Sequence, residues 1–124
     1  MPPRRRKIHS GTKPETKIQK AIVNLLKIND WHIVETHGNM YQSGLPDLYA
    51  CHLHYGSRWI EVKVKDRYKF TSAQLENFPA FAAKGVRIWI LTEATQAEYD
   101  KLFKPANWHM FLDIMKHNSR LRIS

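Results

Sequence analysis

The segment from residue 86 to residue 91 constrains the fold most, because it is almost wholly apolar (Val-Arg-Ile-Trp-Ile-Leu). A strand that is apolar on both faces must be covered on both sides, which is typical of central strands in α/β proteins. A strand with one face in water would instead alternate apolar and polar residues. We therefore predict an α/β fold in which helices cover the sheet.

The sequence predicts one helix, three strands, a second helix and a fourth strand, in that order. Short runs rich in β-branched and aromatic residues, separated by turn residues, predict the first three strands as an antiparallel meander. The fourth strand should return through the second helix by a right-handed crossover and lie parallel to a neighbouring strand. A third helix is expected at 94–103, and the four strands are expected at 31–36, 48–54, 58–65 and 86–91.

Capping boxes mark the starts of the first two helices. Thr12 is expected to cap the first helix with Glu15 as its partner, and Thr71 pairs with Gln74 in the same way at the second. Glu15 precedes the apolar positions of its helix by three and by seven residues, which places it at the edge of the buried face. In the second helix the residues expected to point inward are Leu75, Phe78 and Ala82.

Two short segments place two carboxylates and a lysine at neighbouring strand ends. Asp47 ends the loop before the second strand, while Glu61 and Lys63 alternate onto one face of the third. Two carboxylates that converge repel each other unless a hard cation lies between them, and oxygen ligands suit Mg²⁺ or Mn²⁺. A lysine beside such a cation can stabilise charge that builds up on a phosphate oxygen.

Each of these residues also has a purely structural explanation. Asp47 could be a turn residue, and Glu61 could belong to the solvated face of a hairpin. The apolar fourth strand argues against that second explanation, because an unpaired carboxylate in a covered sheet would be costly. Glu15 and Gln74 could serve only as capping partners, although capping and a role in the site are compatible.

The Pro46-Asp47 and Glu61-Val62-Lys63 segments, with thirteen residues between the two acids, resemble the signature of the PD-(D/E)xK nuclease superfamily. The likeness is to its VRR-NUC and Holliday-junction-resolvase-like branch, and it covers residues 12–92 by element order. It implies a restriction-endonuclease-like core, with a mixed sheet of about four strands flanked by helices. The catalytic residues that the resemblance implies are Glu15, Asp47, Glu61, Lys63 and Gln74. The metal ligands it implies are Asp47, Glu61, the main-chain carbonyl of Val62, and Glu15 directly or through water.

The charge of the chain favours a polyanionic partner. It has 20 Lys and Arg residues against 11 Asp and Glu residues, a net charge of +9, and nucleic acid is the first candidate for such an excess. A basic protein with no such partner is the alternative, but the charge gathers in an N-terminal arm and beside the predicted site. The residues expected to contact DNA are Arg4, Arg5, Arg6, Lys7, Tyr41, Gln42, Ser43, Lys65, Arg67 and Lys69.

These observations lead to a first hypothesis of a Mg²⁺-dependent DNA endonuclease, in which Mn²⁺ can replace Mg²⁺. Phosphate contacts position DNA without reading its sequence, so cutting should be structure-selective. The resemblance adds branched DNA, such as a Holliday junction, as the substrate. Two alternatives stay open: a non-catalytic nucleic-acid-binding module on the same fold, and a nuclease subunit of a larger DNA-processing complex.

The length of 124 residues predicts one domain. We divide it into a basic arm (1–11), a nuclease core (12–104) and an apolar and basic extension (105–124), which could pack on the domain or on a second copy in a C2 homodimer. Cys51 is the single cysteine, so an internal disulfide is excluded. With no secretory signal or membrane-length apolar run, we expect a soluble intracellular protein of a bacterial or phage-infected cell, with no small-molecule cofactor besides the metal.

Overall fold

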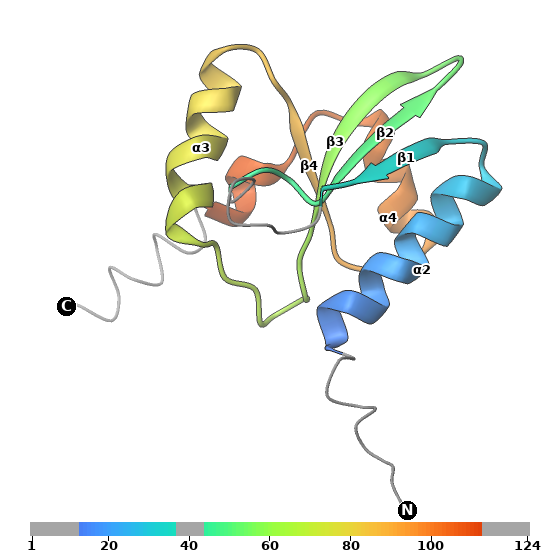
Figure 1. Ribbon diagram of the computed structural model, residues 1–124, viewed down its shortest axis with the longest axis horizontal. Coiled ribbons are helices and arrows are strands. Elements are labelled where there is room, and N and C mark those ends of the chain that lie inside the picture. The colour runs from blue at the N-terminus through green and yellow to red at the C-terminus, as the bar shows by residue number, and fades with distance from the viewer. Residues whose placement is uncertain (1–12, 37–43, 113–124) are drawn as a thin grey trace, which may run out of the picture.

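The computed structural model describes residues 13–36 and 44–112 (Figure 1). Residues 108–112 are helical at the end of this part of the chain. The labelled elements are α2 (Pro14–Ile28), β1 (His32–Glu35), β2 (Leu48–His52), β3 (Gly56–Val62), α3 (Ser72–Ala83), β4 (Ile88–Leu91), α4 (Gln96–Asp100) and the 3₁₀ helix η3 (Lys101–Phe103).

The strands form one mixed sheet in the order β1-β2-β3-β4. β1, β2 and β3 pair antiparallel as the predicted meander, and β4 returns parallel to β3. The register sets Leu48 of β2 opposite Ile60 of β3, and Glu61 of β3 opposite Ile90 of β4. The predicted α/β class, the element order and the mixed four-stranded sheet are confirmed.

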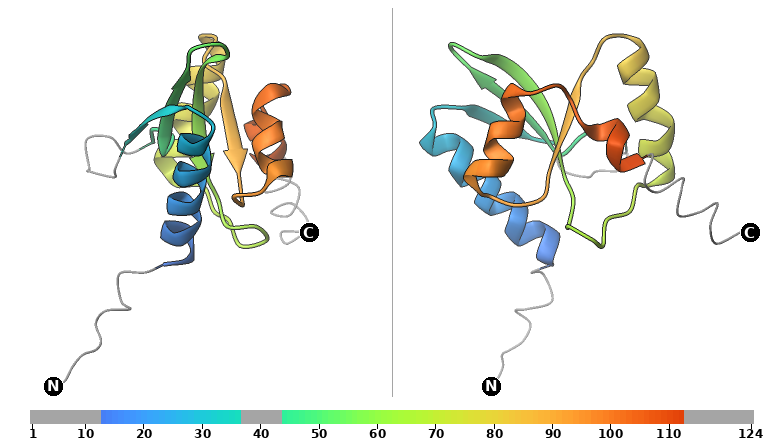
Figure 2. Two further views of the ribbon diagram at one scale, coloured as in Figure 1. Left: turned by 90° about the vertical axis from the view of Figure 1, so that its right-hand side faces the viewer. Right: turned by 180° about the vertical axis from the view of Figure 1, so that it is seen from behind.

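Helices cover both faces of the sheet, as the apolar β4 strand predicted. Figure 1 shows α2 and α3 on either side of the strands. The rear view in Figure 2 (right) shows α4 in front of the sheet. One face packs on α2, α4 and η3 through a cluster that includes Ile22, Leu26, Ile60, Leu91 and Leu102. The other face packs on α3 and the helical residues 108–112 through Phe70, Phe78, Ile88, Ile90 and Leu112.

The start of α2 differs from the prediction. Its N-cap is Lys13, which makes no side-chain capping bond, and Thr12 lies outside the described residues. Pro14 occupies the first helical position, where its fixed φ favours a helix start and its missing N–H is no loss. Glu15 is therefore not at the capping-box position, and it is exposed rather than at the buried edge of the helix.

The start of α3 agrees with the prediction, but its inward face is narrower. Thr71 and Gln74 form both bonds of the capping box. Gln74 and Phe78, one turn apart, are the buried residues of α3. Leu75 is 43% exposed because it lies off the side of the helix that carries Gln74 and Phe78. Ala82 is exposed because the last turn of α3 borders a hollow instead of the core.

Most remaining differences concern element ends. β3 ends at Val62 rather than residue 65, and the chain then turns through Asp66, whose φ is 66°. The expected helix at 94–103 is divided into α4 and η3. Most described apolar residues of the C-terminal extension, including Phe111 and Leu112, pack on the domain itself, whereas Met110 is exposed. Within the described ranges, no helix is both long and apolar enough to cross a lipid bilayer.

Candidate active site

Asp47 and Glu61 are brought together by the pairing of β2 with β3. The main-chain N–H of Asp47, just before β2, donates to Glu61 Oε1 at 3.1 Å. In return, Asp47 Oδ2 accepts a hydrogen bond from the main-chain N–H of Val62 at 2.8 Å. Each acid is thus bonded to the other's strand segment, so the sheet register fixes both carboxyl groups at one point.

Glu61, Lys63 and Gln74 form a buried polar network on the face of the sheet that α3 covers. Lys63 Nζ lies 3.1 Å from Glu61 Oε2 and donates to Gln74 Oε1 at 2.9 Å. Gln74 Nε2 donates to the same Glu61 oxygen at 2.7 Å. The exposed fractions of the three residues are 2%, 4% and 8%. Such a network keeps its members in a single arrangement, because buried polar groups that lose their partners are costly.

Gln74 makes the predicted capping bonds and also contacts two of the candidate site residues. Its Oε1 accepts from the main-chain N–H of Thr71 at 3.1 Å, while Thr71 Oγ1 accepts from the main-chain N–H of Gln74. The same side chain bonds Glu61 and Lys63. The first turn of α3 is therefore tied directly to Glu61, near the end of β3, and to Lys63, just after it.

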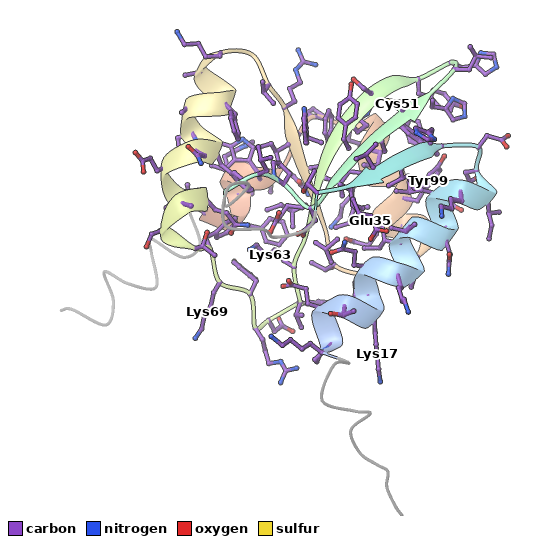
Figure 3. The ribbon with its side chains drawn as sticks, viewed as in Figure 1. Lys17, Glu35, Cys51, Lys63, Lys69 and Tyr99 are labelled. Atoms are coloured by element: carbon purple, nitrogen blue, oxygen red, sulfur yellow. The ribbon has the colours of Figure 1, made fainter. Side chains whose placement is uncertain are left out.

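Two further contacts hold the ammonium of Lys63, and the sequence did not predict either. Lys63 Nζ donates to the main-chain carbonyl of Lys69 at 2.6 Å and lies 4.5 Å from the centre of the Phe70 ring. In Figure 3, Lys63 lies between α2 and α3, and Lys69 lies on the outer side of the connection to α3. The one available signal was the position of Phe70 directly before the cap Thr71; a contact through the Lys69 carbonyl has no sequence signature.

The environment raises the pKa of both acids. Burial raises the pKa of Glu61 to about 8, and the nearby charge of Asp47 acts in the same direction; Lys63 and the hydrogen bonds from Lys63 and Gln74 offset only part of this. Burial likewise raises the pKa of Asp47, against the hydrogen bond from Val62. Two carboxyl groups that resist ionisation side by side retain a proton that a divalent cation could replace.

The residues at this point fit a divalent cation. The N–H and C=O of one strand residue point to the same side, and the Val62 N–H points to Asp47, so the Val62 carbonyl is directed to that side as well. Two carboxylates and a carbonyl form an all-oxygen donor set, which Mg²⁺ and Mn²⁺ prefer. Residues 13–36 and 44–112 contain no cluster of three or more His, Cys, Asp or Glu side chains that could hold a metal, so Glu15 is not gathered in as a third direct ligand.

A solved structure described as a VRR_NUC domain superimposes on this arrangement of strands and helices. The TM-score is 0.59, and the match covers 72% of this chain and 95% of that chain with 19% sequence identity. This chain has the fold of a VRR_NUC domain. The fold that the acidic and lysine motifs implied is thereby confirmed. No family model matches the sequence, and no curated protein matches it either.

On the VRR_NUC fold of this chain, Glu15 lies at the start of α2 near the two acids. Its side chain is exposed, but its charge is close enough to Asp47 to raise the pKa of that carboxyl group. Because Glu15 is not gathered with the two acids as a direct ligand among the described residues, its predicted place at the site stays a prediction, in the form that acts through water.

The predicted DNA contacts are described only in part. Lys65, Arg67 and Lys69 are exposed in the segment between β3 and α3, close to Lys63. They follow Lys63 in the chain, and their contact with DNA stays a prediction. The residues of the basic arm (Arg4, Arg5, Arg6 and Lys7) and of the loop before Asp47 (Tyr41, Gln42 and Ser43) lie outside the described residues.

Gly44 packs against α3 more closely than any other residue type could. Its φ is 91°, and a Cβ at this position would lie 2.3 Å from Asn77 Nδ2 and 3.0 Å from the carbonyl oxygen of Ala73. The structure supplies its physical role: the chain that leads to Asp47 lies directly on the helix that supplies Gln74.

Proposed function

We propose that this protein is a divalent-metal-dependent endonuclease that hydrolyses DNA phosphodiester bonds. We further propose that it prefers branched DNA, such as a Holliday junction. The observation that supports the proposal most strongly is the meeting of half-buried Asp47 with buried Glu61 and Lys63 on a VRR_NUC fold. Buried ionisable groups that are fully partnered and have raised pKa values are typical of sites arranged for chemistry.

We assign two roles to the side chains of the site: some would bind a cation, and Lys63 would stabilise negative charge. Asp47, Glu61 and the Val62 carbonyl would hold Mg²⁺, or Mn²⁺ in its place, and Glu15 would assist through a water molecule. When bound, the cation would supply Lewis-acid chemistry, polarising a phosphate group and lowering the pKa of a bound water molecule. Glu61 must lose its proton to bind a cation, so occupancy and cleavage should rise as the pH approaches 8.

Lys63 contributes a fixed positive charge. Its ammonium is held by Gln74, the Lys69 carbonyl and the Phe70 ring, so it requires little reorganisation when negative charge develops on a phosphate oxygen. A preorganised donor of this kind contributes a factor of about 10²–10³ in rate. Lys63 either stabilises that charge or orients the attacking water.

The basic residues supply a grip on the DNA backbone. Lys65, Arg67 and Lys69 lie beside the network, and the basic arm (residues 4–7) adds further charge. Contacts of this type position the phosphate chain without reading bases, which supports structure-selective cutting. Symmetrical cutting of a junction would further require two active sites, so we propose a C2 homodimer.

The test compares cleavage of junction and duplex DNA with Mg²⁺ and with EDTA. Asp47→Asn, Glu61→Gln and Lys63→Ala should each abolish cleavage while largely preserving junction binding. Lys27→Ala, which changes an exposed lysine at the far end of α2, is the matched control and should cut normally.

Two other results would replace the proposal. Junction binding without cleavage in any metal would favour a non-catalytic binding module. Cleavage that appears only after a partner protein, captured from the source cell, is added would favour a nuclease subunit of a larger complex. Full activity in any of the three site variants would contradict the assignment of that residue.

A further inference from the structure

A second candidate site lies at the opposite end of β3. A hollow of about 1020 Å³ wraps around the beginning of the edge strand β4. Figure 2 (right) shows the segment after η3 crossing to the helical residues 108–112 beside α3, which borders this region. We call it the β4 hollow and define it by the six lining residues used below: Arg58, Trp59, Arg87, Trp89, Lys104 and Trp108.

The β4 hollow is distinct from the acidic network. β3 rises by about 3.3 Å per residue, so the backbone of Arg58 lies about 13 Å from that of Val62. None of the residues that line the hollow belongs to the network of Asp47, Glu61, Lys63 and Gln74. Changes in one site can therefore be made without touching the other.

The charge of the β4 hollow is entirely basic. The described residues that line it include no Asp or Glu. Arg58 is already engaged, because its guanidinium donates to the carbonyls of Leu102 at 2.8 Å and Tyr55 at 2.8 Å. Arg87 and Lys104 are exposed, and no acidic side chain among the described residues forms an ion pair with either. Two cations are thus left for an anionic ligand.

The tryptophans that line the hollow are of two kinds: one is buried and hydrogen-bonded, and two keep part of their surface exposed. Trp89 is 6% exposed and its Nε1 donates to the Lys104 carbonyl at 2.9 Å, so it holds the wall of the hollow in place. Trp59 and Trp108 are only half-buried. Both rings line the hollow together with the two cations.

We propose that the β4 hollow binds unpaired nucleotides, with bases stacked on Trp59 or Trp108 and phosphates bound by Arg87 and Lys104. A basic groove combined with half-open aromatic rings is the combination by which proteins hold single-stranded nucleic acid. The volume is at the upper end of the range of small-ligand pockets, roughly 300–1,000 Å³, and therefore accommodates a nucleotide. A regular duplex would use the cations but would leave the tryptophans without a partner.

The choice of a nucleic acid over another anionic aromatic ligand rests on the proposed function. The nucleotide could come from the single-stranded part of a DNA substrate or from a free nucleotide, and both present the same base and phosphate groups. A substrate-derived strand would give the enzyme a second contact that duplex DNA lacks.

The test uses the full chain with Glu61→Gln in EDTA, so that binding is measured without cleavage. Tryptophan fluorescence is followed during titration with a short oligothymidylate, with thymidine monophosphate and with a blunt duplex. Arg87→Glu and Lys104→Glu should each weaken oligothymidylate binding about tenfold, and Trp108→Leu should weaken binding and reduce the quenching. Lys27→Glu makes the same charge change at an exposed position outside the hollow and should have little effect; thermal melts confirm that each variant is folded.

Several results would overturn the inference. The first is that the unmodified protein binds neither oligothymidylate nor the mononucleotide. The second is that the Arg87→Glu and Lys104→Glu proteins bind oligothymidylate as tightly as the Lys27→Glu protein does. The third is that the duplex binds as tightly as oligothymidylate and is weakened equally by these substitutions. Self-association that Arg87→Glu disrupts without nucleic acid would make the hollow a subunit interface instead. Strong mononucleotide binding identifies a free nucleotide as the source, and binding of the oligomer alone identifies a strand.

This test is separate from the test of the nuclease. If junction DNA is not cleaved but oligothymidylate binding depends on Arg87, the proposed function fails and the hollow stands. If cleavage depends on Glu61 while Arg87→Glu and Lys104→Glu bind the oligomer normally, the nuclease stands and the hollow fails.

Discussion

The two ends of β3 have opposite characters. At its C-terminal end, Glu61 and Lys63 are buried and each bonds to several fixed partners. At its N-terminal end, Arg58 is engaged by carbonyls, but Arg87 and Lys104 face an open hollow. The strand therefore connects the buried network around Glu61 with the open, basic β4 hollow.

The two proposals assign chemistry to the first end of β3 and nucleic-acid binding to the second. A reacting centre needs charges held in place before the reaction begins, and burial between α3 and the sheet achieves this. A surface that accommodates nucleic acid needs exposed cations and aromatic faces. The predictions below test this contrast, starting with the largest expected effect.

The strongest test of the rigid end is Gln74→Ala. This change removes the bonds to Glu61, Lys63 and the Thr71 N–H at once. We expect a loss of about 1–3 kcal/mol in the free energy of unfolding, because buried polar groups lose partners, together with a fall in cleavage of at least about tenfold. Gln19→Ala is the matched control, since Gln19 also donates to a carboxylate, Glu35, but at an exposed position. Similar effects from the two changes, in urea unfolding and in cleavage rate, would contradict the role of Gln74.

The second test concerns the approach of the Asp47 loop to α3. Gly44→Ala and Gly56→Ala both place a side chain at positive φ, which costs about 1–2 kcal/mol. Only at Gly44 would the new Cβ also meet Asn77 and the Ala73 carbonyl; nothing lies within 4 Å at Gly56. We expect Gly44→Ala to be the more destabilising and to reduce cleavage, and Gly56→Ala to leave cleavage unchanged. Equal thermal shifts and equal activities would show that this close contact has no functional role.

The third test uses the pH dependence of stability in metal-free protein. The pKa of Glu61 is about 8 in the folded protein and 4.5 in the unfolded chain. Between pH 4.5 and pH 8, the folded protein therefore keeps a proton on Glu61 that the unfolded chain releases. Stability should therefore fall as the pH rises through this window. Glu61→Gln should flatten the dependence and raise stability at neutral pH by about 1–3 kcal/mol. Denaturant midpoints measured across this window would contradict the account if the unmodified protein became more stable with rising pH.

The smallest effect is expected from the basic arm. Removing residues 1–7 should weaken DNA binding and flatten its dependence on salt, because fewer counterions are released. Cleavage at saturating DNA should change little, since the network is built from residues 47, 61, 63 and 74. Fluorescence anisotropy at several salt concentrations measures this, and an unchanged slope would show that the arm does not contact DNA.

Local patterns predicted much of the fold and part of the site. The apolar run of β4 indicated a sheet covered on both faces, and the Thr71 capping box located the start of α3. Alternation along β3 placed Glu61 and Lys63 on one face. These features could be predicted because each depends on residues only a few positions apart.

Features that depend on contacts between distant segments could not be predicted. The carbonyl of Lys69 and the close approach of Gly44 to α3 have no sequence pattern. The side chain of Asn107 has no such pattern either. It pairs with the free edge of β4, accepting from the Ile90 N–H at 2.6 Å and donating to the Ile90 carbonyl at 3.1 Å. The wrong helix cap at Thr12 arose from two competing local signals, of which the proline at the first helical position was the stronger.

Titration of the protein with Mn²⁺, followed by electron paramagnetic resonance, tests most directly whether Asp47 and Glu61 together hold a cation. We predict saturable binding that tightens as the pH rises toward 8 and releases protons, and that is lost in both Asp47→Asn and Glu61→Gln but kept in Lys27→Ala. Equal Mn²⁺ affinity in the unmodified protein and the two acid variants would contradict the account.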